Sequence, residues 1–245
     1  MTPHRHEARR SFKRPAGGAP TPDDIWLGST WPFVRRWLPS APVRVVEIGC
    51  GESGGHIPTL IKEGYDAVGV DPEAPDAEGY LRQTFESYSS EQPVYAVVAS
   101  LSLHHMEDLP AVLTHVESVL RPGGRLVVVE WISEAFDDDT ARWCFAQRLC
   151  DPEEPGAWLA KAQTMWTESG LPWSEFLRGW LEEHGLHPAA TIQRELKGRF
   201  DTLFEDQAPY FYPDLLDVDA EAEQAAIDAG TIRAGCLRYA GCRKS

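Results

Sequence analysis

The spacing of hydrophobic positions changes along the chain. Through its first half, short apolar runs alternate with segments whose apolar residues recur at helical spacing. The runs at 43–48, 67–70, 95–99 and 125–130 are almost continuously apolar, as expected of strands that are covered on both faces. Strands that alternate with helices favour parallel βαβ units, so the pattern predicts an α/β fold with a doubly wound sheet.

The intervening segments carry helix signals. Apolar residues at helical spacing predict helices over 26–38, 57–62 and 109–120. Asp108 is placed to cap the third of these helices, and Pro110 lies in its first turn, where proline is tolerated. Each of these helices would cover one face of the predicted sheet.

The pattern differs in the second half of the chain. Residues 134–184 are predicted to be helical, with Ser174 as a cap, and strand-like runs return at 190–202 and 232–242. A short strand near 84–85 would complete a seven-stranded, mostly parallel sheet, Rossmann-like, with a helical insertion or lid over 134–184 before the last two strands. This insertion is rich in tryptophan: Trp143, Trp158, Trp166, Trp173 and Trp180. Core packing is the simpler explanation of these tryptophans, and an apolar pocket is the alternative.

Length and charge limit the possible classes. The 245 residues, with 42% hydrophobic content, fit one domain over 23–245, preceded by a polar tail over 1–22 that is predicted to be disordered. A net charge of −15 argues against a nucleic-acid partner, because phosphate binding needs a basic surface. The tail is the exception, and a solvated tail is favoured there over a nucleic-acid arm. Its basic residues are Arg5, Arg9, Arg10, Lys13 and Arg14.

Metal, disulfide and membrane signals are absent from the sequence. The five cysteines are odd in number and lack C-x-x-C spacing, so neither a zinc site nor a disulfide framework is expected. No carboxylate pattern of a metal-dependent enzyme is visible, and no metal is expected. The sequence has no apolar run of about 18 residues and no signal core, so we expect a cytoplasmic protein with no membrane partner. Its oligomeric state is left open.

A glycine-rich stretch follows the first predicted strand. Gly49-x-Gly51-x-x-Gly54 matches the dinucleotide-binding fingerprint, and Asp71 lies near the position of that fingerprint's ribose-binding acid. Glycine suits a backbone that turns sharply or approaches a ligand closely. By itself, this stretch does not separate a dinucleotide from another nucleoside ligand.

Two neighbouring features favour a ligand without phosphate. Glu47 precedes the glycines by two positions, where a carboxylate would repel a pyrophosphate but attract an ammonium or sulfonium group. The turn from Arg121 to Arg125, Arg-Pro-Gly-Gly-Arg, follows a predicted helix and leads into the fifth strand.

Together these stretches resemble a known family. VVEIGCGESGG, AVGVDPE, YAVVASLSLHHMEDL and LRPGGRLVVVEW occur in that order within residues 43–131. This region resembles the class I S-adenosylmethionine (SAM)-dependent methyltransferases, particularly the small-molecule enzymes similar to the ubiquinone/menaquinone-biosynthesis (type 11) group. The resemblance implies SAM as cofactor and does not extend over residues 134–245.

The resemblance also implies roles for individual residues. Glu47 would orient the methionine ammonium of SAM, and Asp71 would accept hydrogen bonds from both ribose hydroxyls. Glu86 is the best match for an adenine contact. Ser100 and Leu101 would lie near the sulfonium. The full set of expected cofactor-binding residues is Glu47, Gly49, Cys50, Gly51, Asp71, Pro72, Glu86, Ser100 and Leu101.

The expected reaction is an in-line methyl transfer to oxygen, nitrogen or carbon of a small-molecule acceptor. Such a reaction depends on alignment and, for a hydroxyl acceptor, on a proton sink. His104 and His105 follow the fourth strand and are the candidate bases, with a structural role as the alternative. The residues expected near the acceptor are Trp31, Arg35, Glu130 and Trp131.

Other functions stay open at this level. The same fold can bind SAM and catalyse a non-methylation reaction, or serve as a non-catalytic sensor or scaffold. A macromolecular methyltransferase is also possible. The acidic chain argues against it, as does the stretch Ser100-Leu-Ser-Leu-His104, which stands where many enzymes acting on planar amines carry an Asn/Asp-Pro-Pro-Tyr motif.

Overall fold

The structure is a computed structural model that describes residues 19–244. Its centre is one seven-stranded sheet with the order β3-β2-β1-β4-β5-β7-β6. Neighbouring strands from β3 to β5 are parallel, whereas β7 runs antiparallel to both β5 and β6. The fold is therefore the predicted α/β class. The strands are β1 (Arg44–Ile48), β2 (Asp66–Val70), β3 (Tyr80–Leu81), β4 (Val94–Ser100), β5 (Leu120–Trp131), β6 (Phe200–Ala208) and β7 (Cys236–Arg243).

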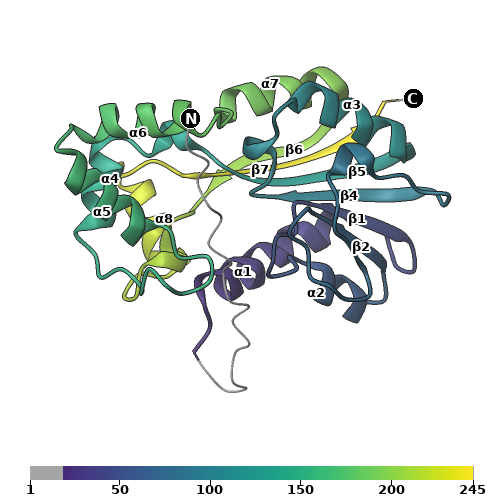
Figure 1. Ribbon diagram of the computed structural model, residues 1–245, viewed down its shortest axis with the longest axis horizontal. Coiled ribbons are helices and arrows are strands. Elements are labelled where there is room, and N and C mark those ends of the chain that lie inside the picture. Colours follow the sequence, from purple (N-terminus) through teal and green to yellow (C-terminus); the bar gives the residue numbers. More distant parts are fainter. Residues whose placement is uncertain (1–18, 245) are drawn as a thin grey trace, which may run out of the picture.

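Helices cover both faces of this sheet and one of its ends (Figure 1). In the view shown, α1 and α2 lie below the sheet and α3 and α7 lie above it, while α4, α5, α6 and α8 form a group at one end that we call the helical lobe. The helices are α1 (Pro22–Trp37), α2 (Ile57–Lys62), α3 (Leu109–Val119), α4 (Asp138–Phe145), α5 (Leu159–Ser169), α6 (Trp173–Glu183), α7 (Ala189–Arg199) and α8 (Ala220–Asp228). Short 3₁₀ turns are η1 (Phe85–Ser87), η2 (Leu103–His105), η3 (Ser133–Ala135) and η4 (Tyr212–Asp214).

The central strands alternate their side chains between two hydrophobic layers. Val46 and Val128 face the layer formed with α3 and α7, whereas Val45 and Val127 face the layer formed with α1 and α2. Both sets are fully buried, which explains why these strands are continuously apolar in the sequence. The sheet therefore fixes the positions of the strand ends, where the site is built.

Two sequence-based element predictions were wrong. The strand-like stretch 190–202 is mostly helix α7, because Ala189, Ile192 and Leu196 recur at helical spacing and are buried on one face. The third strand is Tyr80–Leu81, whereas the predicted site at 84–85 leads into the 3₁₀ turn η1. A two-residue strand offers too little periodicity to be recognised in sequence.

Helix starts were predicted with mixed success. Asp108 caps α3 as predicted, since its side chain accepts a hydrogen bond from the Ala111 N–H. Ser174 does not cap α6, which begins one residue earlier at Trp173, after Pro172. The predicted tail 1–22 falls mainly outside the described residues, and its last residue, Pro22, already begins α1.

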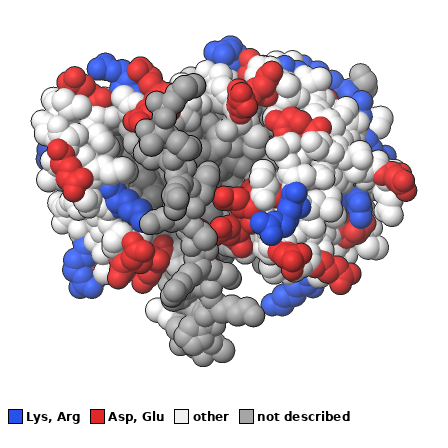
Figure 2. Space-filling model, viewed as in Figure 1, with Lys and Arg blue, Asp and Glu red and all other residues white. Residues whose placement is uncertain are grey.

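The described residues carry a mixed surface. On the face in Figure 2, acidic and basic side chains are interspersed over the sheet side and the helical lobe. Among these residues, no helix is long and apolar enough to cross a membrane. The same part of the chain holds no group of three or more His, Cys, Asp or Glu side chains arranged to bind a metal ion.

Candidate active site

The loop that joins β1 to α2 has a backbone that only glycine adopts easily. Gly49 and Gly51 have φ angles of 72° and 60°, in the left-handed region. A Cβ atom at Gly49 would lie 2.3 Å from Cβ of Ser102, so this glycine is also required for close packing. At Gly51 a Cβ would meet no atom within 4 Å. The loop is therefore tightly packed at Gly49 and open at Gly51.

Asp71 lies beside the open part of this loop. It follows β2, and its Oδ2 accepts a hydrogen bond from the Gly51 N–H at 3.1 Å, while Oδ1 accepts one from the Glu73 N–H at 2.7 Å. Its side chain is half-buried. The sequence motif thus brings the acid and the glycine loop together at the carboxyl ends of β1 and β2.

Glu47 lies under the loop, where its side chain is enclosed. Its carboxylate is buried and accepts a hydrogen bond from the His56 N–H at 2.8 Å. A Cβ at Gly55 would lie 2.6 Å from both carboxylate oxygens, so the loop seals the group. Burial raises the pKa of Glu47 to about 8, against the opposing effect of the His56 and Ile57 N–H groups. Glu47 therefore holds the loop from below, and its contact with the methionine ammonium of SAM stays a prediction.

The other expected cofactor residues near the loop are Cys50, Pro72 and Glu86. Cys50 is buried within it, and burial raises the pKa of its thiol to about 12, so the thiol is protonated near neutral pH. Pro72 is exposed next to Asp71. Glu86 is exposed in η1, following buried Phe85. Of these three residues, Cys50 alone belongs to the loop.

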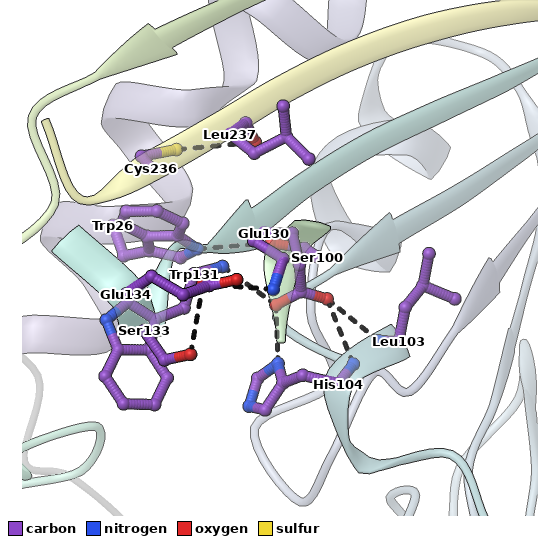
Figure 3. A network of polar contacts seen from close by, with 11 residues as sticks. Trp26, Ser100, Leu103, His104, Glu130, Trp131, Ser133, Glu134, Cys236 and Leu237 are labelled. Carbon is purple, nitrogen blue, oxygen red and sulfur yellow. Dashed lines mark hydrogen bonds and ion pairs between the residues drawn. The ribbon is translucent and has the colours of Figure 1, made fainter. Parts of the chain in front are cut away.

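The end of β4 connects the loop side to the helical side. Oγ of Ser100 accepts a hydrogen bond from Nε1 of Trp26 in α1 at 3.1 Å (Figure 3). Leu101, the next residue, has φ = 52° and is the one non-glycine residue with positive φ in the described chain. Its N–H donates to the Val129 carbonyl at 2.8 Å. Such a strained backbone persists only where its surroundings hold it, and it concentrates at functional sites.

His104 and Glu130 form a buried pair at the ends of η2 and β5. Nδ1 of His104 lies 2.5 Å from Oε1 of Glu130, as Figure 3 shows. The carboxylate also accepts hydrogen bonds from the N–H groups of Leu103 and Trp131, each at 2.9 Å. Glu130 is fully buried, so it does not face the mouth of the site as expected from the sequence; it fixes the His104 ring instead. Within the described chain, no residue hydrogen-bonds Nε2 of His104.

His105 lies directly beside this pair. The two imidazole rings are 4.0 Å apart between centroids. Desolvation, with a smaller effect of neighbouring His104, lowers the pKa of His105 to about 4, so this ring is neutral near pH 7. No carboxylate of the described residues fixes the His105 ring in the way that Glu130 fixes the His104 ring.

A cavity of about 310 Å³ opens between the strand ends and the helical lobe. Leu101 and Trp131 bound it at the ends of β4 and β5, and both histidines line it. The other wall is largely aromatic and comes from the lobe and the segment after β6. That wall includes Trp158, Met165, Trp173, Phe176, Trp180 and Tyr210. Three of the tryptophans predicted within 134–184 therefore line a cavity, so they do more than fill a core.

Sequence and fold comparisons agree on one family. A family model described as a methyltransferase domain matches residues 9–197 of the chain. The chain belongs to this family. It is a class I SAM-dependent methyltransferase, as the motifs of residues 43–131 predicted. No curated protein matches its sequence.

Solved structures share the fold of this methyltransferase at low sequence identity. A SAM-dependent methyltransferase from Mesorhizobium loti has 19% identity and a TM-score of 0.52, with 88% of this chain and 98% of that chain covered. The N-methyltransferase NodS from Bradyrhizobium japonicum, in complex with S-adenosyl-L-homocysteine, has 14% identity and a TM-score of 0.51, with 92% and 89% covered. A methyltransferase in complex with the Haloferax volcanii activator Trm112 has 14% identity and a TM-score of 0.55, with 91% and 92% covered.

The glycine loop of the methyltransferase fits its cofactor, SAM. The open space at Gly51 lies next to the Asp71 carboxylate, which suits a ribose with two hydroxyl donors. Beneath the loop, Oγ of Ser102 is buried and has no hydrogen-bond partner among the described residues. A buried polar atom without a partner is uncommon and marks a place where a ligand or water can bind.

Two residues expected near the acceptor lie elsewhere in the methyltransferase. Arg35 is exposed, 3.6 Å from the Glu63 carboxylate and above the ring of Tyr65, which is at the amino end of β2. This is the edge of the sheet opposite the site, so the expectation for Arg35 was wrong. Trp31 lies beside the glycine loop, with its ring 6.0 Å from that of His56, and does not line the cavity.

Two buried carboxylates hold the aromatic wall, and the sequence analysis missed both. Glu223 of α8 accepts hydrogen bonds from the N–H groups of Tyr210, Phe211 and Tyr212, at 2.7 to 3.1 Å. Asp214 accepts from the N–H groups of Trp158 and Leu159, at 2.8 and 3.0 Å, where α5 begins. Their partners are distant in the sequence or lie in irregular backbone, so no periodic pattern marks these two acids.

Proposed function

We propose that this methyltransferase transfers the methyl group of SAM to a small, apolar, aromatic acceptor that binds in the cavity. The observation that carries the proposal is the position of the cavity. It is enclosed on one side by the strand ends that follow the glycine loop and on the other by the aromatic wall. Pockets of a few hundred Å³ with mostly apolar walls and few polar groups are typical of small-molecule sites.

The cofactor would be held by the loop and the neighbouring strand ends. We propose that Gly49, Cys50 and Gly51 support it through their backbone and that Asp71, followed by Pro72, binds its ribose. Ser100 and Leu101 would lie near its sulfonium, and exposed Glu86 is the candidate contact for adenine. Within a single domain over 23–245, the helices of 134–184 would act as the lid of the acceptor site.

His104 is the proposed general base. When bound, SAM supplies an activated methyl group on a sulfonium. Nε2 of His104 would take the proton that the acceptor hydroxyl loses when it is methylated. Glu130 holds Nδ1 of the same ring, which fixes its orientation and stabilises the imidazolium that forms. This arrangement supports an acidic hydroxyl as the acceptor group.

The experiment that tests the function uses the full chain with SAM labelled on its methyl group. The protein is incubated with a cell metabolite extract and, separately, with total RNA and total protein, and the label is followed in each fraction. We expect label in a small molecule. Label that enters only RNA or protein would overturn the acceptor class, and no label with any of the three would overturn the proposed reaction under these conditions.

A further inference from the structure

The charge of the cavity wall has one sign. Among the described residues that line the cavity there is no Asp or Glu, whereas Lys161, on the first turn of α5, is one of them. Lys161 forms no ion pair with any residue in the part of the chain that the structure describes. Other Lys and Arg side chains in the described part of the chain, such as Lys62 and Arg178, also form no ion pair, so the position of Lys161 on the cavity wall is what distinguishes it.

This charge pattern disfavours a cationic acceptor. Aromatic rings alone attract ammonium groups through their faces, and the wall is rich in such rings. However, a cation in the cavity would lie near the ammonium of Lys161 without a carboxylate in the lining to offset the repulsion. The buried carboxylate of Glu130 lies behind His104, and it accepts hydrogen bonds from the His104 ring and from the N–H groups of Leu103 and Trp131.

The same wall disfavours a phosphorylated acceptor. Phosphate groups are commonly bound by arginine forks or by the free N–H groups of a helix N-terminus. Among residues 19–244, no arginine lines the cavity. At the start of α5 the N–H groups of Trp158 and Leu159 donate to Asp214, and in α6 the Ser174 N–H donates to Asp138. A single lysine ammonium suits a single negative charge.

We infer that the acceptor of the proposed reaction is an aromatic carboxylate whose carboxylate group is bound by Lys161. This inference rests on the proposed function and adds the charge of the substrate to it. The flat ring packs against the tryptophan and tyrosine rings, and Lys161 binds the carboxylate through a charge-assisted hydrogen bond. Lys161 thus selects acids over amides and amines of the same shape.

The test measures binding and needs no turnover. The full chain is loaded with S-adenosyl-L-homocysteine, and its affinity for three probes of equal shape is measured by calorimetry: 2-naphthoate, the neutral 2-naphthamide and the cationic 2-naphthylmethylammonium. The variants are Lys161→Met, which keeps the length of the side chain, and Lys161→Glu, which reverses its charge. Lys62→Met, on an exposed position of α2, is the matched control.

We expect wild type and Lys62→Met to bind naphthoate about 10- to 100-fold more tightly than naphthamide, the usual effect of one charge-assisted hydrogen bond. Lys161→Met should remove this preference, and Lys161→Glu should favour the ammonium probe. Equal affinities for naphthoate and naphthamide in wild type, tightest binding of the cation, or no binding of any probe would each overturn the inference. The cofactor titration separates the two claims: if S-adenosyl-L-homocysteine binds while the probes fail, only the acceptor assignment is lost.

Discussion

On the cofactor side of the site, a short glycine loop closes over one buried carboxylate, Glu47. On the acceptor side, buried Asp214 binds the start of α5, 56 residues earlier at Trp158, and buried Glu223 binds the segment after β6, 11 to 13 residues earlier. The first arrangement is made within the ten residues from Glu47 to His56, whereas the second joins α5, α8 and the segment after β6. The cofactor side therefore depends on local backbone geometry and the acceptor side on tertiary contacts.

This difference suggests that the cofactor side can be common to many enzymes, whereas the acceptor side is particular to this one. A loop made of neighbouring residues keeps its geometry when the helices around it change, so it can serve one cofactor in many proteins. An aromatic wall assembled from distant segments changes when any one of those segments changes. The acceptor that fits the wall then changes as well. The pair His104 and Glu130 lies where the two sides meet, and it is the most direct place to test the comparison.

Removing the imidazole of His104 should have the largest effect. His104→Ala should lower kcat by about 100-fold or more, because the acceptor proton loses its base, while the affinity for SAM stays nearly unchanged. The measurement is the single-turnover rate with labelled SAM and a substrate found in the extract experiment. His105→Ala is the matched control, since its ring is 4.0 Å away but is not fixed by Glu130, and it should lower the rate by less than about tenfold. Equal losses in both variants would remove the special role of the His104–Glu130 pair.

The second prediction addresses the tertiary contacts of the acceptor side. Glu223→Ala leaves three buried N–H groups without an acceptor and should lower the free energy of unfolding by about 3 kcal/mol or more. Denaturant unfolding measures this loss. Glu221→Ala, at an exposed position of the same helix, should change stability by less than about 0.5 kcal/mol. A small loss in the Glu223 variant would mean that the aromatic wall is held by ring packing alone.

The comparison also explains what the sequence revealed. Strands β1, β2, β4 and β5, the loop at Gly49 and Gly51, and the acid Asp71 were predicted, because each signal lies in a few consecutive residues. Glu47 was recognised, but its burial under Gly55 was not, since that burial depends on how the loop folds back. The order and hydrophobicity of residues do not encode that closure.

The acceptor side was harder to predict for a physical reason. Trp158, Trp173 and Trp180 have the same helical spacing whether they fill a core or line a cavity, and only packing against the strand ends decides. Arg35 was expected at the site, but its position along α1 places it by Glu63 and Tyr65, at the amino ends of the strands. Glu130 was expected at the mouth of the site, but its carboxylate is buried and pairs with the ring of His104.

The third prediction concerns the cofactor side alone. Asp71→Ala should weaken the binding of S-adenosyl-L-homocysteine by at least about tenfold, since a carboxylate that accepts hydrogen bonds from a ligand is lost. Calorimetry measures the affinity. Asp66→Ala, at the opposite end of the same strand, breaks an exposed ion pair with Arg44 and should leave the affinity unchanged. If both variants bind the cofactor as wild type does, the loop does not need its acid, and the proposed ribose contact fails.

The smallest effect at pH 5 is expected at Glu47, and its pH dependence sharpens the contrast between the two sides. Burial raises the pKa of this carboxyl from 4.5 to about 8, so the folded protein binds its proton more tightly than the unfolded chain does. The stabilising contribution of the protonated group is complete below about pH 4.5 and is lost as the pH rises towards about 8. Glu47→Gln, which is neutral at every pH and has the same shape, should therefore change the free energy of unfolding by only about 1 kcal/mol at pH 5. Between pH 5 and 8 the wild type should lose stability relative to this variant, as measured by denaturant unfolding at each pH. A constant difference over that range would show that the loop holds a carboxylate whose charge is already compensated, and the predicted contact of Glu47 with the cofactor's ammonium would gain support.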